Sequence, residues 1–278
     1  MKLIADCGST KIDWCVIDNG QLVKQIFTCG MNAIMLTEEE MAAQIAKELK
    51  AEVAEYAIDE VYFYGAGCIS EEVCDNVRRA IAKSVPAKLI EVHTDLLAAA
   101  RALCGRKKGI ACILGTGSNS CYYDGEKIVD NVSPLGYILG DEGSGAVLGK
   151  LLVGDVLKKQ IPEKLCEKFL KQYELDRLTI IQRVYKQPGA NRFLASVTPF
   201  LIQNIEEPAI HRLVLNSFKS FFVRNIANYD NYKNLPVNFI GSIAHYYQDV
   251  LREAADAVDC HIGTIIKSPM AGLIEFHK

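Results

Sequence analysis

Two short turns of glycine and hydroxyl residues have the composition of phosphate-binding loops. The first is GST at residues 8–10, directly after the apolar run that ends in Asp6 and Cys7, and the second is GTGS at residues 115–118. Such turns expose backbone N–H groups and hydroxyls with little steric bulk, so they can surround phosphate oxygens. Each turn taken alone is better explained as an ordinary hairpin turn. The position of the turns in the chain must therefore decide between a hairpin and a phosphate-binding loop.

The chain contains an internal repeat, and the two turns occupy equivalent places in it. Residues 3–23 and 110–129 both read as an apolar strand, a Gly/Ser/Thr turn, a second strand, a tight turn and a third strand. The tight turns are Asn19-Gly20 and Asp124-Gly125, which are strong hairpin signals. The repeat predicts a duplicated chain whose two phosphate turns face each other across a cleft and hold a polyphosphate from both sides.

Asp6 breaks the symmetry of the repeat, because the second copy has Ile113 or Leu114 near the matching place. A polyphosphate brings Mg²⁺, which usually keeps several waters and takes few protein carboxylates. We therefore predict that Asp6 is a Mg²⁺ ligand, through water. The alternative is a carboxylate that caps its own turn through Ser9 or Thr10.

A third candidate segment, LGDEGSGAVLGK at residues 139–150, does not satisfy the Walker A pattern. Its glycines are one residue too far apart, and Leu151 stands where Ser or Thr should bind the metal. Asp141 and Glu142 remain as acids in a glycine turn that leads into a helix. Asp141 can line the cleft, or it can simply place negative charge at a helix N-terminus.

Asp95 is the candidate general base. It is the last residue of the predicted strand segment at residues 87–95 and precedes LLAAARAL, an apolar helix, so its carboxylate is expected at the domain junction. Phosphoryl transfer needs mainly positioning and charge neutralisation, with one carboxylate to accept the proton of the nucleophile. The alternative is that Asp95 is only a helix N-cap. His93 is close by, but a lone histidine at a strand end is more often structural.

Strands that alternate with helices predict an α/β fold. Thr37 and Glu40 form a capping box before one amphipathic helix, and Ser70 caps another. Buried strands are predicted at residues 61–67 and 87–95; the second copy is mainly helical from about 142 to 230 and then continues VNFIGSIA, a helix and CHIGTII. We expect two domains, at residues 1–105 and 106–278.

Composition excludes several function classes. The 278 residues are 50% hydrophobic, carry a formal charge of −3 and contain no run of apolar residues long enough for a membrane helix. Without clustered cations we expect no nucleic-acid surface. Asp6 interrupts the N-terminal apolar run, which argues against a secretory signal. None of the ten cysteines forms CxxC, so we expect structural thiols in a reducing cytoplasm.

Taken together, the loops resemble those of a known family. The chain is similar to the sugar-kinase branch of the actin, hexokinase and Hsp70 superfamily, and specifically to the N-acetylglucosamine kinase group of the BadF/BadG/BcrA/BcrD ATPase family. DCGSTK resembles the first phosphate loop, LGTGSNS the second, LGDEGSG the segment after it, FIGSIA the adenosine loop and SPMAG the closing element. The resemblance implies two duplicated ribonuclease H-like (actin-like ATPase) domains with a central nucleotide and sugar cleft.

The resemblance also implies a role for individual residues. Asp6 matches the Mg²⁺-associated acid and Asp95 the acid that takes the proton of the sugar hydroxyl. Positions that match ATP contacts are Gly8, Ser9, Thr10, Lys11, Gly115, Thr116, Gly117, Ser118, Gly241 and Ser242. Positions that match sugar contacts are Asn32, Gly67, Asp95, Ser118, Asn119, Gly136 and Asp141. The implied reaction transfers the γ-phosphoryl group of ATP, with Mg²⁺, to a hydroxyl of an amino sugar, most simply N-acetylglucosamine.

Two departures from the family pattern leave the sugar open. Leu135 stands where the family commonly has an aromatic residue, and the chain is shorter than animal members, so N-acetylmuramic acid or glucosamine is an alternative substrate. Two other functions are compatible with the fold: an ATPase that activates a dehydratase or reductase through a shared [4Fe-4S] cluster, and a non-catalytic sugar sensor. The sequence predicts no membrane partner and leaves a homodimer open.

Overall fold

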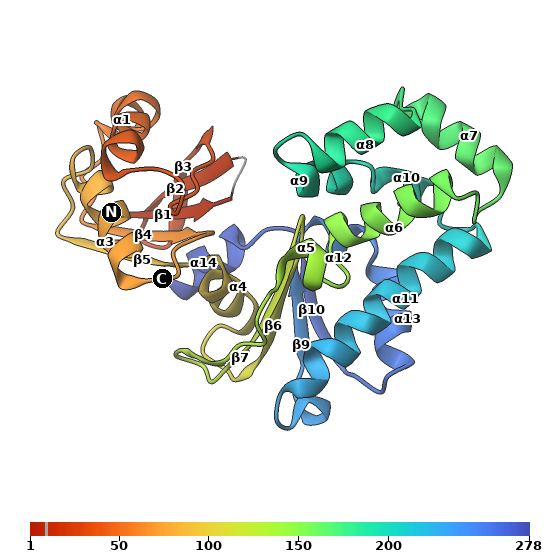
Figure 1. The fold of residues 1–278 in the computed structure, drawn as a ribbon. Coiled ribbons are helices and arrows are strands. Elements are labelled where there is room, and N and C mark those ends of the chain that lie inside the picture. The colour runs from red at the N-terminus through yellow and green to blue at the C-terminus, as the bar shows by residue number, and fades with distance from the viewer. Residues whose placement is uncertain (9–10) are drawn as a thin grey trace. The chain divides into compact units, whose positions relative to one another are not determined.

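The computed structural model describes residues 1–8 and 11–278 (Figure 1). The chain forms two compact units. Unit 1 comprises Met1–Lys107, Asp124–Ile128 and Ser268–Lys278, and unit 2 comprises Lys108–Tyr123 and Val129–Lys267. The first boundary lies close to the expected division after residue 105, whereas the last eleven residues, expected in the second domain, pack with unit 1.

Unit 1 is built on a mixed five-stranded sheet with the order β3-β2-β1-β4-β5. Its strands are β1 (Lys2–Cys7), β2 (Lys11–Asp18), β3 (Gln21–Cys29), β4 (Glu60–Gly65) and β5 (Leu89–Thr94). The first three strands are antiparallel neighbours, and β4 and β5 run parallel to β1. The predicted Asn19-Gly20 turn joins β2 to β3, with positive φ at both residues as a tight hairpin of this type requires.

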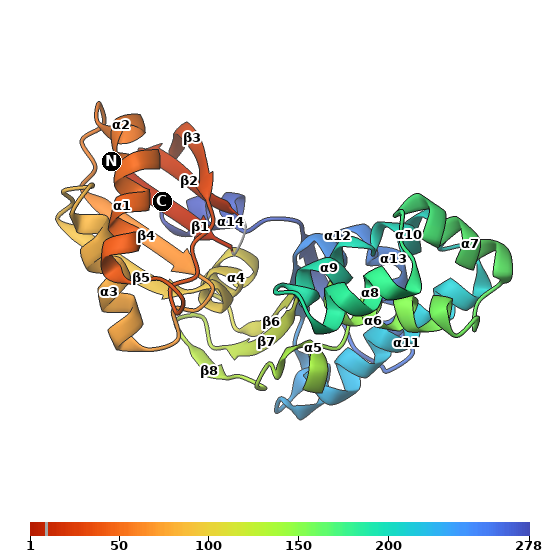
Figure 2. The same cartoon turned by 45° about the horizontal axis from the view of Figure 1, so that its top comes forward.

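Helices cover both faces of this sheet (Figures 1 and 2). One face packs against α1 (Glu38–Glu48), α2 (Lys50–Val53) and α3 (Glu71–Ala82), and the other packs against α4 (Asp95–Cys104) and α14 (Met270–Phe276). Thr37 forms the predicted capping box of α1, and Ser70 caps α3. Both helix starts are therefore confirmed.

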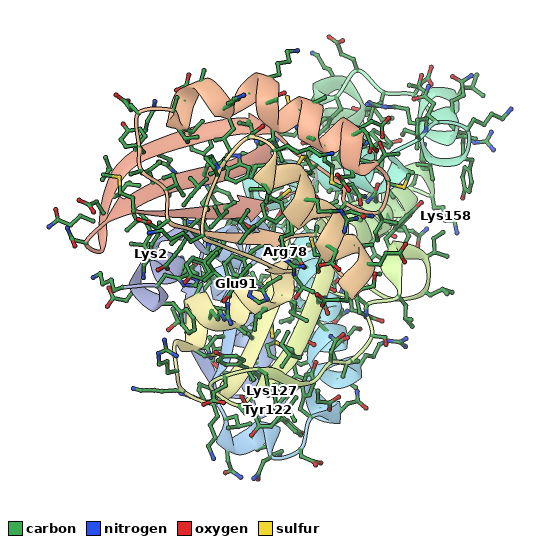
Figure 3. The ribbon with its side chains drawn as sticks, turned by 90° about the vertical axis from the view of Figure 1, so that its left-hand side faces the viewer. Lys2, Arg78, Glu91, Tyr122, Lys127 and Lys158 are labelled. Carbon is green, nitrogen blue, oxygen red and sulfur yellow. The ribbon has the colours of Figure 1, made fainter. Side chains whose placement is uncertain are left out.

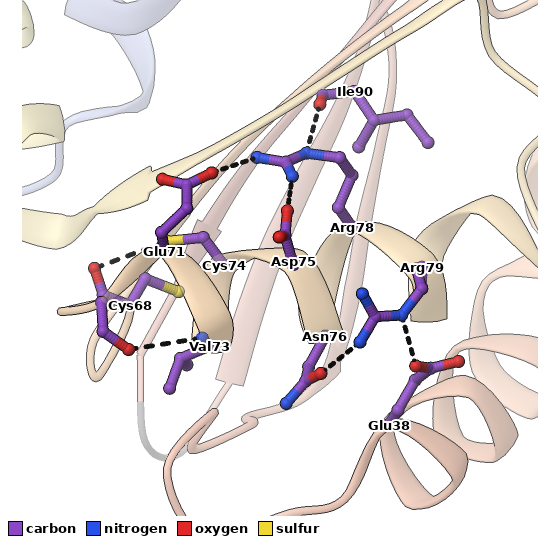
Figure 4. A network of polar contacts seen from close by, with 11 residues as sticks. Glu38, Cys68, Glu71, Val73, Cys74, Asp75, Asn76, Arg78, Arg79 and Ile90 are labelled. Carbon is purple, nitrogen blue, oxygen red and sulfur yellow. Dashed lines mark hydrogen bonds and ion pairs between the residues drawn. The ribbon is translucent and has the colours of Figure 1, made fainter.

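Ion pairs fasten α3 to its neighbours. Arg79 pairs with Glu38 of α1, and Arg78 donates from Nε to the carbonyl oxygen of Ile90 in β5 while it pairs with Asp75 of its own helix (Figure 4). Figure 3 shows Arg78 among the other side chains. These contacts hold the helix layer in place beside β4 and β5, the strands whose carboxyl ends precede Gly67 and Asp95.

Unit 2 repeats the sheet of unit 1 strand for strand. Its order β10-β9-β6-β7-β8 corresponds to β5-β4-β1-β2-β3, and its strands are β6 (Gly109–Leu114), β7 (Ser118–Tyr123), β8 (Ile128–Asp130), β9 (Val237–Ile240) and β10 (Ile262–Ile266). The duplication read from the sequence is thereby confirmed, and the fold is α/β as predicted.

A long helical insertion separates the two halves of the second sheet. Between β8 and β9 the helices are α5 (Gly136–Leu139), α6 (Gly145–Leu157), α7 (Glu163–Gln172), α8 (Arg177–Tyr185), α9 (Ala190–Ser196), α10 (Pro199–Gln203) and α11 (Pro208–Arg224), with 3₁₀ turns at Ile226–Asn228 and Tyr232–Asn234. Two further helices, α12 (Ser242–Tyr246) and α13 (Gln248–Asp256), connect β9 to β10. They share one apolar core with β6 and β9. Among the residues described, no helix combines the length and apolar character needed to cross a membrane.

Candidate functional site

Two aspartates of unit 1 form a cross-strand pair where β1 ends. Asp6 in β1 lies directly opposite Asp13 in β2. Both alternate with the residues buried against α1 and α3, so both side chains belong to the sheet face that α4 and α14 cover. Asp13 is buried, and both of its carboxylate oxygens accept from Nε2 of Gln25, at 2.8 and 3.0 Å.

The carboxylates of this site are electrostatically coupled. Burial raises the pKa of Asp6 to about 7, and the nearby acids Asp13 and Asp95 act in the same direction. Lys11 is the cation that opposes this rise in the pKa of Asp6. Burial also raises the pKa of Asp95, against which backbone hydrogen bonds at the start of α4 act. A group of acids with so little compensating charge is a place where a cation or a proton is stabilised.

Asp95 begins α4 but is not its N-cap. Thr94 caps the helix by accepting from the backbone N–H of Leu97 at 3.1 Å, and Asp95 is the first helical residue. The alternative in which Asp95 serves only as a cap is therefore wrong. Because Gly65 pairs with Cys7 in β1 and with Thr94 in β5, the carboxyl ends of these parallel strands meet at one edge of the sheet, where Asp6 and Asp95 both lie.

The remaining predicted residues of unit 1 surround the same strand ends. The backbone N–H of Gly8 donates to the carbonyl oxygen of Lys11 at 3.0 Å. The Nζ atom of Lys11 lies 4.8 Å from the centre of the Phe27 ring. Ser9 and Thr10 lie outside the residues that the structure describes. Asn32 is exposed, and its side-chain oxygen would lie 3.1 Å from a Cβ placed on Gly67, whose φ is +89°. The two predicted sugar contacts Asn32 and Gly67 are thus neighbours.

In unit 2, backbone hydrogen bonds connect the GTGS turn to the start of α6. The backbone N–H groups of Gly145 and Ala146 donate to the carbonyl oxygens of Gly115 and Thr116, at 2.8 and 3.0 Å. The first amides of α6 are therefore occupied by the turn, which explains structurally why this helix is not a Walker A helix. Open space surrounds a Cβ placed on Gly115, so the outer side of the turn leaves room for a ligand.

Asp141 adopts a left-handed backbone, with φ of +54°, and faces the GTGS turn. Its Oδ2 would lie 3.1 Å from a Cβ on Gly117. Burial raises the pKa of Asp141, and hydrogen bonding from the backbone of Ser118 and Gly136 opposes this shift. The first turn of α6 contains no acid, so Asp141 does not serve as the negative charge of that helix terminus.

Gly241 brings the predicted adenosine loop against the same turn. Its φ is +120°, and a Cβ there would lie 2.3 Å from the carbonyl oxygen of Leu114, so only glycine fits. Beside it lies a mainly apolar cavity of about 490 Å³, which is large enough for a nucleoside. Its lining residues include Ser196, Thr198, Ser242, Tyr246 and Tyr247.

Other predicted residues have partners of their own. The side-chain oxygen of Asn119 accepts from Nδ2 of Asn131 at 2.9 Å, and Gly136 begins α5 with φ of +72°. Glu142 is in an ion pair with Arg224, which makes it a structural acid. Leu135, in the place of the family's aromatic residue, is 56% exposed.

Reasoning from the sequence missed two features of the site. Asp13 was overlooked although an acid in the middle of the apolar strand KIDWCVID was a usable signal. Tyr246 and the neighbouring cavity wall come from segments about fifty residues apart, and no local pattern predicts that they meet.

The acids of unit 1 fit a hydrated divalent cation. Within residues 1–8 and 11–278, no basic side chain forms an ion pair with Asp6, Asp13 or Asp95, and no three His, Cys, Asp or Glu side chains are arranged to hold a metal directly. Uncompensated carboxylates without a closed ligand cage suit Mg²⁺, which keeps most of its waters. Asp6 and its neighbours would hold such an ion through those waters.

Comparison with solved structures identifies relatives. A protein from Porphyromonas gingivalis, described as a "putative N-acetylglucosamine kinase", has 48% identity with this chain and a TM-score of 0.96, over 100% of this chain and 98% of its own. A protein from Chromobacterium violaceum with the same description has 16% identity and a TM-score of 0.75, over 100% and 98%.

A third similar structure is a ROK family glucokinase from Streptomyces griseus in complex with glucose and AMPPNP. It has 14% identity and a TM-score of 0.61, over 99% of this chain and 97% of its own, so it supports the fold alone. No protein-family model and no curated protein matches the chain. The 48% identity over the full length decides the relationship: the chain belongs to the N-acetylglucosamine kinase-like family of carbohydrate kinases with the actin-like ATPase fold.

Proposed function

We propose that the protein is an ATP-dependent kinase that transfers the γ-phosphoryl group to a hydroxyl of an amino sugar, with N-acetylglucosamine as the first candidate. The observation that carries this proposal is in unit 2, where Gly241 packs directly on the strand end that begins the GTGS turn. In this proposal the GTGS turn would hold phosphate oxygens, and the cavity lined by Ser242, the residue after Gly241, would hold the nucleoside.

In the proposed reaction, the GTGS turn and Ser242 bind ATP, and Asp95 accepts the proton of the sugar hydroxyl. Bound Mg²⁺ would neutralise phosphate charge near Asp6. Burial suits Asp95 to its role because it moves the pKa of the carboxyl toward neutrality, where a general base is most effective. Asn32 and Gly67 are assigned to sugar binding because they lie together near the strand ends of unit 1.

The alternative function as an activating ATPase is less well supported. A cluster shared between subunits needs cysteines at an accessible helix end. Cys112, beside the second turn, is fully buried in β6 within the apolar core, and the turn continues into β7 rather than into a helix.

An ADP-release screen tests the proposal. The purified protein is assayed with ATP and Mg²⁺ against N-acetylglucosamine, N-acetylmuramic acid, N-acetylmannosamine, glucosamine and glucose, each with a no-sugar control. We expect sugar-dependent ADP release that is highest with an N-acetylated amino sugar. Equal ADP release with and without sugars would indicate an ATPase, and sugar binding without ADP release would indicate a sensor; either result contradicts the proposal.

A further inference from the structure

Asp13 is an unusual residue for its position. It is the third residue of β2, on the sheet face that α4 and α14 cover, and only 8% of it is exposed. A buried carboxylate is costly unless it is paired or hydrogen-bonded. Here the partners are Gln25, a neutral amide on the next strand, and the thiol of Cys15, whose Sγ lies 3.8 Å from Oδ1 of Asp13. Both donors are neutral, so the negative charge is oriented but not compensated.

The second unit shows that the fold itself does not require this acid pair. In the corresponding hairpin, Ile113 of β6 lies opposite Asn119 of β7, where unit 1 has Asp6 opposite Asp13. The two sheets have the same strand order and the same parallel and antiparallel neighbours. Two carboxylates at this place therefore serve a task that unit 1 has and unit 2 lacks.

The spacing of Asp6 and Asp13 limits the role that the two carboxylates can have. Directly opposite residues of an antiparallel pair have Cβ atoms about 5 Å apart and project from the same face. That separation lets both carboxylates face one hydrated cation and accept hydrogen bonds from the waters that such an ion usually keeps. Nζ of Lys11 lies over Phe27, so it does not fill the space between the acids with an ion pair.

We propose that Asp13, oriented by Gln25, is a second carboxylate of the divalent-cation site and positions cation-bound water together with Asp6. This inference rests on the proposed function, because the cation is the one that accompanies the nucleotide. Asp13 acts through water, so it is a positioning residue and not a general base. Removing an outer contact of this kind typically lowers metal affinity about 10-fold to 100-fold.

The test measures metal affinity without turnover. Isothermal titration calorimetry gives the affinity for ADP in EDTA and over a series of Mg²⁺ concentrations, and Mn²⁺ electron paramagnetic resonance measures binding of the ion to the protein–ADP complex. Asp13→Asn should need about 10-fold more Mg²⁺ or Mn²⁺, while its ADP affinity in EDTA should not fall. Asp13→Glu, which keeps the charge, should lie closer to the parent protein.

Asp18→Asn is the matched control, since Asp18 lies on the same strand at its opposite end, beside the Asn19-Gly20 turn. It should leave metal affinity unchanged. The same Mg²⁺ and Mn²⁺ dependence in Asp13→Asn as in the parent overturns the inference and assigns Asp13 to folding. A parent protein that binds no ADP, with or without metal, overturns the proposed function itself and with it this inference.

Folding is checked in the same samples through Trp14, the single tryptophan, which is fully buried next to Asp13. If Asp13→Asn does not fold, Gln25→Leu replaces it, because this change on an exposed residue keeps the carboxylate and removes its two hydrogen bonds. A several-fold weaker Mn²⁺ affinity in Gln25→Leu supports the inference, and an unchanged affinity overturns it.

Discussion

His277 should make the stability of unit 1 depend on pH in the mildly acidic range. The ring lies in the interior between α14 and β4, stacked on Tyr62, and its Nε2 is 2.7 Å from the hydroxyl of Tyr64. Arg101 donates to that same hydroxyl at 2.7 Å, and in this arrangement the Tyr64 O–H can donate to Nε2 of a neutral His277. Burial first, and then the positive charge of Arg101, lowers the pKa of His277 from 6.5 to about 3.

The sign and the size of the effect follow from proton linkage. Above pH 6.5 the histidine is neutral in both the folded and the unfolded chain, so it adds no pH dependence. As the pH falls from 6.5 toward 3, His277 becomes protonated in the unfolded chain but stays neutral in the folded chain. The free energy of unfolding therefore falls by up to about 1.4 kcal/mol per pH unit. At pH 4.5 the loss from this one residue is about 2–3 kcal/mol.

Urea unfolding between pH 7 and pH 4.5, followed by Trp14 fluorescence, measures this loss in unit 1. His277→Gln removes the titrating group but keeps an acceptor for Tyr64. Between pH 7 and pH 4.5 the unfolding free energy of this variant should therefore fall by about 2–3 kcal/mol less than that of the parent protein. Contributions of the carboxylates are common to both proteins and cancel. The control is His261→Gln, at an exposed histidine of unit 2. Parallel curves for the parent and His277→Gln would refute the reasoning.

Three predictions concern the proposed reaction. Asp95→Asn should lower kcat by about 10²–10⁴ while calorimetric ADP affinity and the Tm stay near those of the parent, because Thr94 caps α4; a kcat near the parent value would remove Asp95 as the base. Gly117→Val should weaken ATP binding in calorimetry, since its Cβ would lie 3.1 Å from Oδ2 of Asp141, whereas Gly154→Ala, in open space on α6, should not; unchanged affinity in the first variant would contradict the phosphate turn. Asp6→Asn should lower turnover and shift the Mg²⁺ titration to higher concentration, and an unaltered titration would favour a turn cap.

Local signals in the sequence predicted most of the elements and the duplication. Thr37 with Glu40, Ser70 and the Asn19-Gly20 pair each satisfy backbone groups or φ angles within a few residues of themselves, so their effect does not depend on the rest of the chain. The glycine turns were recognisable for the same reason. Two copies of one pattern then predicted two sheets of the same topology, which the strand order confirms.

The composition of the site was decided by tertiary structure, because it depends on pairing between segments that are distant in sequence. Strand register places Asp13 opposite Asp6, and packing of the turn before α6 brings Asp141 to Gly117. The Asp6–Asp13 pair does not follow from residue types alone, since a shift of one residue in register would turn each side chain to the other face. The approach of Asp141 to Gly117 depends on how two separate turns pack, which no local pattern predicts. Residue types and their spacing predict which residues could bind phosphate and which could accept a proton. That Asp6, Asp13 and Asp95 influence one another's ionisation depends on the packing of β1, β2 and the end of β5. Burial and the coulombic coupling between these carboxylates exist only in the folded unit.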